Sequence, residues 1–242
     1  VFVFIMAILP MMGGSTMNLM RAESPGPSVG KLVPHLKSTA QILYVIYFGM
    51  TVVQVILLLL GGMSLFEAIT TSFSVAGTGG FGIVNDSMGS YSTYCQVVTT
   101  IFMILFGVNF SAYYLLLTKK FVQAFKFEEV RYYFGIILAA ILVIGLNTAH
   151  LFRNLGEAFQ QAAFQVGSII TTTGFSSTDF SQWPSLSKTI LVLLMFVGAC
   201  AGSTGGGIKV SRILILCKAA KKEFQLYLHP NAVKKIKMDE KT

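Results

Sequence analysis

Uncharged, apolar stretches follow one another along the chain and are separated by short polar segments. No Asp, Glu, Lys or Arg occurs in residues 1–20, 38–66, 87–118, 132–152 and 189–208. Each stretch contains an apolar core close to the ~20 residues that cross a bilayer as a helix. The clearest runs are Ile42–Leu60 and Phe134–Leu146. This pattern predicts an all-α, multi-pass membrane protein.

Two further uncharged stretches, residues 68–85 and 158–178, are rich in Thr, Ser, Gln and Gly. As spans exposed to lipid they would leave polar groups unpaired, so they are better read as re-entrant loops that are buried in protein or line water. We expect a short helix to open each loop, at 64–76 and 154–170. Ser64 and Glu67 have the spacing of a capping box at the start of the first short helix.

The two re-entrant loops are repeats of one another. Thr78-Gly79-Gly80-Phe81 and Thr172-Thr173-Gly174-Phe175 lie 94 residues apart, and the same offset pairs Ala68 with Ala162 and Ser74 with Ser168. Each loop follows one hydrophobic span and precedes another. The repeating unit is therefore a span, a short helix, a glycine-containing loop and a second span, which is a common plan in membrane transport proteins.

Glycine and threonine in such loops suit the transport of a monovalent cation. The ion must shed water, and neutral backbone carbonyls can replace its hydration shell without trapping it. Glycine tolerates the backbone angles that aim successive carbonyls at one axis, and threonine hydroxyls can add oxygens. A short helix whose C-terminal end faces the path contributes partial negative charge. The predicted ion-binding residues are Thr78, Gly79, Gly80, Phe81, Thr172, Thr173, Gly174 and Phe175.

Glycines also interrupt the last hydrophobic span, at 198–212. Each Gly costs a helix roughly 1 kcal/mol relative to Ala, so three in succession should break it. Broken spans at membrane depth line cavities or move, which predicts a flexible gate below the filter. Close helix packing through small residues is the structural alternative. The predicted gate residues are Gly202, Ser203, Thr204, Gly205, Gly206 and Gly207.

Asn109 follows Gly107 in the corresponding span of the earlier repeat. An asparagine inside an apolar helix is costly unless it is paired, so we expect it to bond across helices or to the pore loop.

Composition supports the membrane interpretation. The chain is 54% hydrophobic and 12% charged, whereas a soluble domain carries roughly twice that charged share. The net charge of +8 is not taken as a sign of nucleic-acid binding, because the basic residues gather in segments that the positive-inside rule would make cytoplasmic. Those segments are residues 19–38, 119–131 and the chain from Lys209 onward. Acidic residues on the opposite side, Glu67, Asp86, Glu157 and Asp179, suit a cation path but are also ordinary loop residues.

The chain as a whole resembles the TrkH family of the TrkH/KtrB superfamily of potassium transporters. The resemblance covers essentially the whole chain and is carried by residues 7–27, 78–82, 171–175, 198–216 and 228–233. It implies tandem repeats of the potassium-channel-like type, with potassium held by backbone carbonyls of Gly80, Gly174 and their neighbours. It also implies a homodimer in the bacterial inner membrane, a cytoplasmic nucleotide-binding regulator of the TrkA type, contact of the basic tail with membrane lipid, and no cofactor.

The resemblance also implies a division of the chain. Residues 1–18 are expected to end the first repeat, and 19–38 and 119–131 to be cytoplasmic loops. Residues 39–118 and 132–222 are expected to form the second and third repeats, and 223–242 a linker to a missing fourth repeat. On this interpretation the chain is a fragment that lacks the first filter loop.

The predicted function is potassium uptake, by channel-like conduction or by symport with another cation. No membrane-buried acid stands out as a proton relay, which favours conduction. An alternative is a secondary transporter of another small solute or cation, such as sodium or ammonium, with the same broken helices. An enzyme is not expected, because the acidic residues are scattered and form no catalytic cluster.

Overall fold

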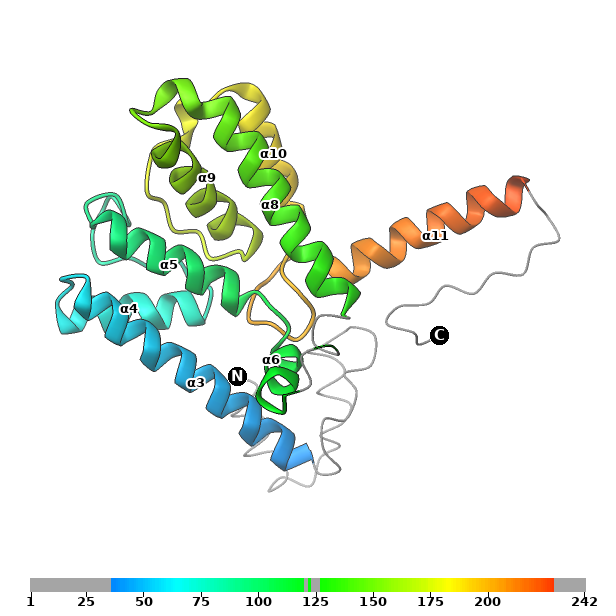
Figure 1. The fold of residues 1–242 in the computed structure, drawn as a ribbon, viewed down its shortest axis with the longest axis horizontal. Helices are drawn as coiled ribbons and strands as arrows, with labels where there is room; N and C mark the ends of the chain where they lie inside the picture. The colour runs from blue at the N-terminus through cyan, green and yellow to red at the C-terminus, as the bar shows by residue number, and fades with distance from the viewer. Residues whose placement is uncertain (1–35, 120–121, 123–126, 229–242) are drawn as a thin grey trace.

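The computed structural model describes residues 36–119, 122 and 127–228, and Figure 1 shows their arrangement. The prediction of an all-α protein is confirmed for this part of the chain, where the only extended pairing is a single bridge between Val197 and Ile208. The predicted end of a first repeat at 1–18 lies outside the described residues. So do most of the loop at 19–38 and the linker beyond 228.

The first half of the described chain is built from four helices. The long helix α3, Leu36–Leu60, packs against the short helix α4, Leu65–Ala76, and both pack against α5, Thr93–Phe106. Helix α6, Phe110–Leu117, follows α5 after a sharp bend and returns to α3. The capping box predicted for α4 is confirmed: Ser64 Oγ accepts from Glu67 N at 3.3 Å, and Glu67 Oε2 accepts from Ser64 N at 2.9 Å.

The second half has the same order. Helix α8, Glu128–Thr148, is continued by the 3₁₀ turn η2, Ala149–Leu151, and packs along α9, Leu155–Ile170. After the 3₁₀ turn η3, Phe180–Gln182, helix α10, Ser185–Phe196, packs on both α8 and α9. Helix α11, Val210–Leu228, follows an irregular loop. The short helices expected at 64–76 and 154–170 are confirmed to within a residue at each end.

Helices α3 and α8 are each long and apolar enough to cross a membrane, and α5 with α6 make a further candidate if that bent pair is one span. Helix α8 begins at Glu128, earlier than the span expected from residue 132. Helix α11 runs to Leu228, past the expected end of the third repeat at 222.

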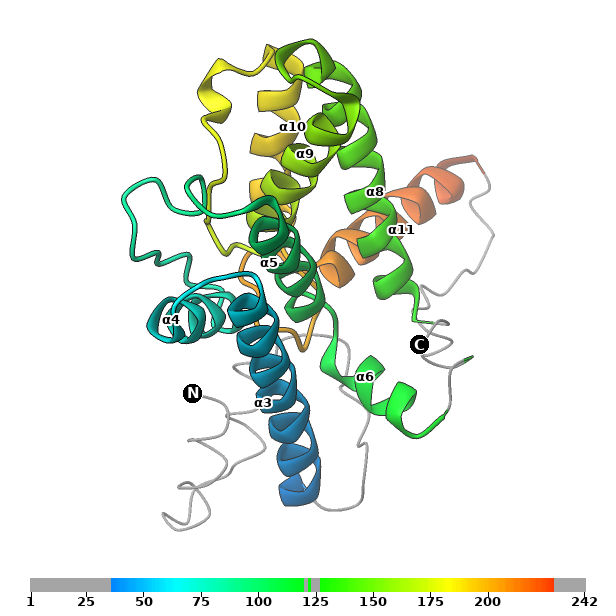
Figure 2. The same cartoon turned by 60° about the vertical axis from the view of Figure 1, so that its left-hand side comes forward.

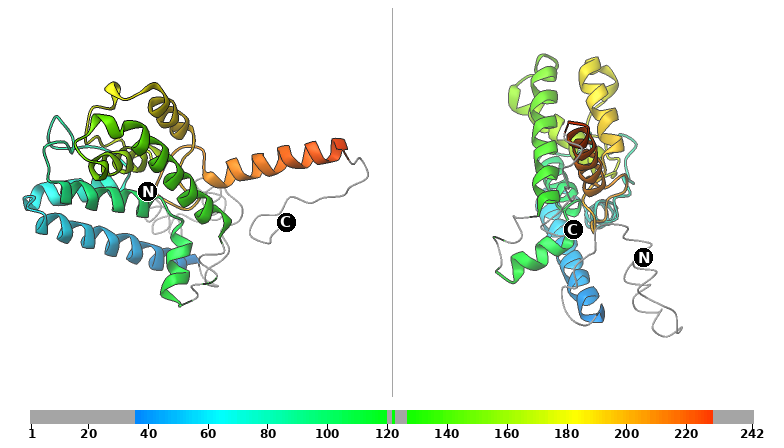
Figure 3. Two further views of the ribbon diagram at one scale, coloured as in Figure 1. Left: turned by 45° about the horizontal axis from the view of Figure 1, so that its top comes forward. Right: turned by 90° about the vertical axis from the view of Figure 1, so that its right-hand side faces the viewer.

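Two apolar cores hold the helices. One is formed mainly by α3, α4 and α5 and also contains Phe164 and Phe175 of the second half. The other is formed mainly by α8, α9 and α10 and also contains Val108 and Ala112 of the first half. The halves meet where α9 packs against α5, as the neighbouring positions of these helices show in Figures 1 and 2. Helix α11 contacts α8 and then extends away from the other helices, which Figure 3 shows from two sides.

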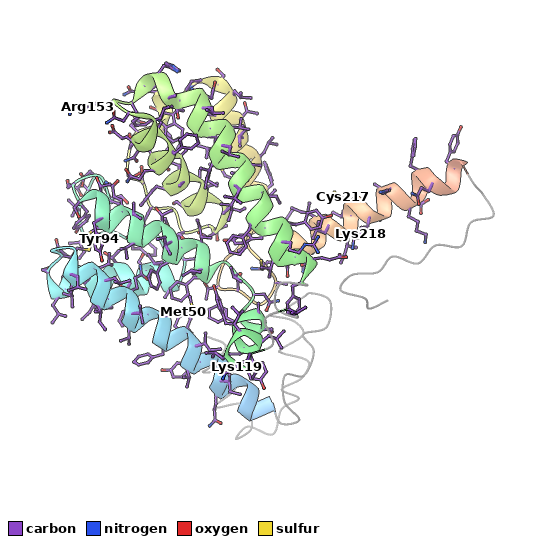
Figure 4. All side chains as sticks on the ribbon, viewed as in Figure 1. Met50, Tyr94, Lys119, Arg153, Cys217 and Lys218 are labelled. Atoms are coloured by element: carbon purple, nitrogen blue, oxygen red, sulfur yellow. The ribbon has the colours of Figure 1, made fainter. Side chains whose placement is uncertain are left out.

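Labelled residues mark the two ends of the molecule. Figure 4 shows Arg153 and Tyr94 at one end, whereas Lys119 lies toward the other end and Lys218 on α11. The positive-inside rule predicts that the end with Lys119 and α11 is the cytoplasmic one.

Candidate functional site

The loops that follow α4 and α9 have positive φ angles at corresponding residues. Thr78 and Thr172 have φ of 50° and 58°, and Gly80 and Gly174 have φ of 68° and 90°. Positive φ therefore recurs at every second residue in both loops. Left-handed conformation at alternate residues turns successive carbonyls toward one side of the chain, which an extended strand cannot do.

Equivalent hydrogen bonds hold both loops to their helices. Gly79 N donates to Ser74 O at 2.7 Å, and Thr173 N donates to Ser168 O at 2.9 Å. The hydroxyls of the same serines reach further along: Phe81 N donates to Ser74 Oγ at 2.7 Å, and Ser168 Oγ donates to Phe175 O at 2.6 Å. These serines therefore fix each loop at both ends, which explains why they recur at the repeat offset.

Thr78 and Thr172 are strained. Positive φ is rare for a β-branched residue and costs of order 1–3 kcal/mol. Their hydroxyls are engaged: Thr78 Oγ1 donates to Gly77 O at 2.8 Å, and Thr172 Oγ1 donates to Thr171 O at 2.6 Å. Glycine would relieve the strain at either position, so the presence of threonine indicates that the hydroxyl has a use.

The two loops touch each other. A Cβ atom on Gly80 would lie 2.0 Å from Thr173 O, so no side chain fits there without moving one loop. A Cβ on Gly174 would meet no atom within 4 Å. Gly80 is thus required by contact between the loops, whereas Gly174 is required only by its backbone angle.

Residues 197–209 connect α10 to α11 through a narrow, closed loop, here called the glycine loop. Its two ends are joined by Gly198 N, which donates to Ile208 O at 2.7 Å, and by Val210 N, which donates to Ala199 O at 3.2 Å. Gly202 and Gly207 have positive φ, 69° and 72°. The predicted break of the last span is therefore confirmed, and it takes the form of an ordered loop.

The glycine loop binds both threonines of the preceding loops. Thr78 Oγ1 donates to Thr204 O at 3.2 Å, and Gly206 N donates to Thr172 Oγ1 at 2.7 Å. Thr78 and Thr172 are the first residues after the helix caps Gly77 and Thr171. One loop thus contacts the equivalent position of both repeats.

The glycine loop also inserts into the bend between α5 and α6. Cys200 N donates to Gly107 O at 3.0 Å, Phe110 N donates to Gly202 O at 3.1 Å, and Thr204 Oγ1 donates to Phe106 O at 3.2 Å. The backbone groups that the bend frees are therefore satisfied by the glycine loop.

Known proteins share this arrangement along the whole chain. The TrkH family, described as cation transport proteins, matches residues 1–242. The chain belongs to the TrkH family.

Individual relatives extend this result. The Trk system potassium uptake protein TrkH of Vibrio parahaemolyticus is 36% identical over 245 residues, which cover 98% of this chain and 50% of that protein. TrkG of Escherichia coli K12 is 32% identical over 237 residues, covering 96% of this chain and 49% of that protein. The crystal structure of the potassium transporter TrkH from Vibrio parahaemolyticus matches with a TM-score of 0.82 and 34% identity, covering 100% of this chain and 50% of that chain. This TrkH-family chain thus spans about half the length of these relatives.

Asn109 lies outside regular helix in this TrkH-family chain, so the prediction that it sits inside an apolar helix is wrong. Helices α5 and α6 are bent by 94° at this point, and Asn109 caps α6 by accepting from Ser111 N at 2.8 Å. A Cβ on Gly202 would lie 3.3 Å from Asn109 Oδ1. The asparagine therefore shapes the bend into which the glycine loop inserts.

Glu129 is a buried acid that the sequence reasoning missed. Its side chain is 4% exposed. Glu129 Oε1 accepts from Ala201 N at 2.7 Å and from Ser211 N at 3.0 Å. One carboxylate oxygen thus holds both the glycine loop and the first turn of α11. From the sequence, Glu129 is expected in a loop at 119–131, whereas the structure places it in the first turn of α8.

The outer end of the TrkH-family chain is held by glutamines. Gln96 of α5 accepts from Gln160 Nε2 at 2.8 Å and from Gln161 Nε2 at 3.2 Å, both on α9. A cleft of about 730 Å³ opens here, and Glu157 is among its lining residues. The two repeats are therefore joined by polar contacts at the outer end and by the glycine loop at the inner end.

Glu67 stabilises the start of α4 at this end of the molecule. Tyr91 Oη donates to Glu67 Oε1 at 3.1 Å. Hydrogen bonds from Ser64 hold the pKa of Glu67 below its usual value, and burial together with the bond to Glu67 raises the pKa of Tyr91 to about 12. Near neutral pH the carboxylate is therefore charged and the phenol keeps its proton, as the observed bond requires.

Proposed function

We propose that the protein containing this chain takes up potassium across the bacterial cell membrane, and that the loops at 78–81 and 172–175 line the ion path. The observation that carries this proposal is the shared backbone of the two loops, with left-handed conformation at alternate residues and direct contact between Gly80 and Thr173. The printed names of the relatives, potassium uptake proteins, agree with it.

Backbone carbonyls are the proposed ligands for the ion. Carbonyl oxygens are neutral, so several of them can replace the water around a monovalent cation without binding it too tightly to leave. Helices α4 and α9 end at the loops and turn their partially negative ends toward the path. A filter of about four such loops is needed by analogy with potassium channels, and two of them belong to this chain.

The glycine loop is the proposed gate. It bonds to the hydroxyls of Thr78 and Thr172, which lie at the inner end of the proposed path. Because Gly206 N donates to Thr172 Oγ1, the glycine loop and a potassium ion compete for that oxygen. Opening requires that Thr204 and Gly206 release both threonines.

The proposal includes a homodimer and a cytoplasmic nucleotide-binding regulator of the TrkA type. Helix α11 leads directly from the glycine loop and carries Lys218, Lys221 and Lys222 on the cytoplasmic side. Phe224 and Tyr227 are exposed near its end. A regulator or anionic lipid that moves α11 would therefore pull on the gate through a single continuous segment.

We expect Gly174→Ser to reduce potassium uptake by about tenfold or more in the full-length protein, since a left-handed non-glycine residue costs roughly 1–2 kcal/mol. The measurement is growth on limiting potassium together with rubidium uptake. Gly62→Ser is a matched control, because Gly62 has the same φ of 90° and equal space around it but lies in the turn after α3. Wild-type uptake and ion preference in Gly174→Ser would refute the filter assignment.

A further inference from the structure

Polar side chains are buried among the packed helices α3, α4 and α5. Gln54 of α3, Ser72 of α4 and Thr99 of α5 are each 0% exposed. Four of their atoms, the oxygen and nitrogen of the Gln54 amide and the two hydroxyl oxygens, have no hydrogen-bond partner among the described residues. Buried polar atoms in native proteins are almost always paired with protein or ordered water. Four unpaired atoms in one apolar core therefore point to a bound partner.

Helices α3 and α5 run antiparallel and touch at both ends. At the outer end, Cys95 Sγ donates to Gly61 O at 3.4 Å. At the inner end, the rings of Tyr47 and Phe106 meet edge to face with centroids 5.6 Å apart. Because both helices rise by about 1.5 Å per residue, residues near the middle of these two segments lie at a similar height in the core.

The three polar residues share this height. Gln54 is midway between the two contacts of α3, and Thr99 lies between the two contacts of α5. Helix α4 packs against both α3 and α5 (Figure 1) and leads to Thr78, whose hydroxyl bonds to Thr204 of the glycine loop beside α5. Ser72 therefore lies near the middle of the same height, on the buried face of α4.

The second half of the described chain has no such unpaired atoms at the corresponding positions. These positions follow from an offset of 94 residues in α8 and α9 and of 92 in α10, as the starts of α5 and α10 show, and they are Thr148, Val166 and Leu191. They are equally buried, at 0%, 0% and 1% exposure. Val166 and Leu191 belong to an apolar core, and Thr148 Oγ1 donates to Ile144 O of its own helix at 2.8 Å. The unpaired polar centre thus belongs to the second repeat.

We infer that the core of α3, α4 and α5 binds one water molecule, held by Gln54, Ser72 and Thr99. Buried waters typically make about three hydrogen bonds to polar groups that have no other partner. The amide of Gln54 offers donors and an acceptor, and each hydroxyl can donate or accept. An ion is an unsuitable ligand, because Glu129 of α8 is the only charged residue among the described buried ones and no charge in this core would balance it.

This water gives α4 an attachment at its middle. The start of α4 is held through Glu67, which accepts from Tyr91 Oη, and its end through Thr78, which donates to the glycine loop. A water bound to Ser72 holds the middle of the helix to both neighbours, and such a bridge is nearly as favourable as a direct hydrogen bond. In the third repeat, α9 is held at this point by apolar packing instead.

The direct test is electron density in crystals of the full-length protein. One peak should lie within hydrogen-bonding distance, about 2.7–3.2 Å, of the side chains of Gln54, Ser72 and Thr99. It should be absent from the triple variant Gln54→Met, Ser72→Ala and Thr99→Val. Side chains that bond directly to one another, or that stay apart with no peak between them, would overturn the inference. An anomalous signal from rubidium at the peak would identify an ion and overturn it too.

Melting temperatures of the same variants provide a second test. Gln54→Met, Ser72→Ala and Thr99→Val should each lower the melting temperature by roughly 1–4 °C, because each takes one partner from the water and leaves the other groups under-bonded. The triple variant should recover most of the loss, since no polar atom remains to be paired. Single variants that raise the melting temperature would show that these atoms are unpaired in the wild-type protein and contradict the bound water.

Thr100→Val is the matched control for Thr99→Val. Thr100 is also buried, at 7% exposure, but its hydroxyl donates to Gln96 O of its own helix at 2.8 Å. Its effect on the melting temperature should add to that of Gln54→Met, whereas the effect of Thr99→Val should not. Equal coupling of the two threonines to Gln54 would count against the site. Neither measurement depends on ion transport, so this inference and the proposed function can fail separately.

Discussion

Replacing Gly80 by alanine should abolish potassium uptake by the full-length protein and lower its thermal stability. The new Cβ would lie 2.0 Å from Thr173 O and 3.0 Å from Thr173 C. It would also require an L side chain at a φ of 68°. The left-handed conformation costs roughly 1–2 kcal/mol, and a forced shift of packed atoms adds about 1–3 kcal/mol. The two loops must then separate, which displaces the carbonyls of both.

Two variants isolate the cause. Gly62→Ala carries the same left-handed penalty, but its new Cβ meets no atom and the residue lies outside the two ion-path loops, so this variant should retain uptake. Gly174→Ala has the same penalty inside the loop but open space around the new atom, so it should lose uptake with less loss of stability than Gly80→Ala. Rubidium uptake and melting temperature of the purified proteins provide the measurements. Equal behaviour of Gly80→Ala and Gly62→Ala would contradict the contact between the loops.

Glu129→Ala should make uptake independent of the regulator. The substitution leaves Ala201 N and Ser211 N without their buried acceptor, and each unpaired buried donor costs about 1–3 kcal/mol. The substitution therefore destabilises the conformation in which the glycine loop binds Thr78 and Thr172. The gate should therefore open more often, and basal rubidium flux in liposomes without the regulator should rise by about tenfold or more.

The neighbouring acid supplies a control for this prediction. Glu128 forms an ion pair with Lys218 of α11 at the protein surface, and exposed pairs of this kind contribute about 0–1 kcal/mol. Glu128→Ala should therefore change basal flux little. The basal flux of Glu129→Gln should lie between those of Glu128→Ala and Glu129→Ala, because the glutamine amide oxygen can still accept hydrogen bonds from Ala201 N and Ser211 N. Basal flux that stays at the wild-type level in Glu129→Ala, with the protein folded, would exclude Glu129 as an anchor of the gate.

Features that depend on neighbouring residues could be predicted from the sequence. The capping box of Ser64 and Glu67 and the ends of α4 and α9 depend on contacts within a few residues. The correspondence of Thr78 with Thr172 is visible as a sequence repeat, and both residues have a positive φ angle in the structure. The break at 198–207 follows from the helix cost of consecutive glycines.

Features that depend on distant residues could not be predicted in this way. A single glycine, Gly107, does not predict that the helix bends by 94°. The bend persists because Tyr133 Oη donates to Ile104 O at 3.1 Å and Tyr113 Oη donates to Leu105 O at 2.7 Å. Tyr133 lies close enough that a Cβ on Gly107 would be 2.2 Å from its oxygen. These partners are distant in sequence or belong to the helix that the bend creates.

Glu129 was missed for a related reason. It stands next to Glu128 and two residues before Arg131, in a segment that also carries Lys119, Lys120 and Lys126, and such a segment resembles a solvated loop. Its burial arises from the glycine loop, more than seventy residues later in the chain. The signal available in the sequence was weak: an acidic residue directly before a long apolar run, on the same side of the membrane as the predicted gate.

The most direct test of the account is the position of rubidium in crystals of the full-length protein. Anomalous difference density should appear between the loops at 78–81 and 172–175, within coordination distance of backbone carbonyls of both Gly80 and Gly174 or their immediate neighbours. The peak should disappear in Gly174→Ser and persist in Gly62→Ser. Rubidium bound elsewhere along the transport path, with no density at these loops in the wild-type protein, would contradict the account.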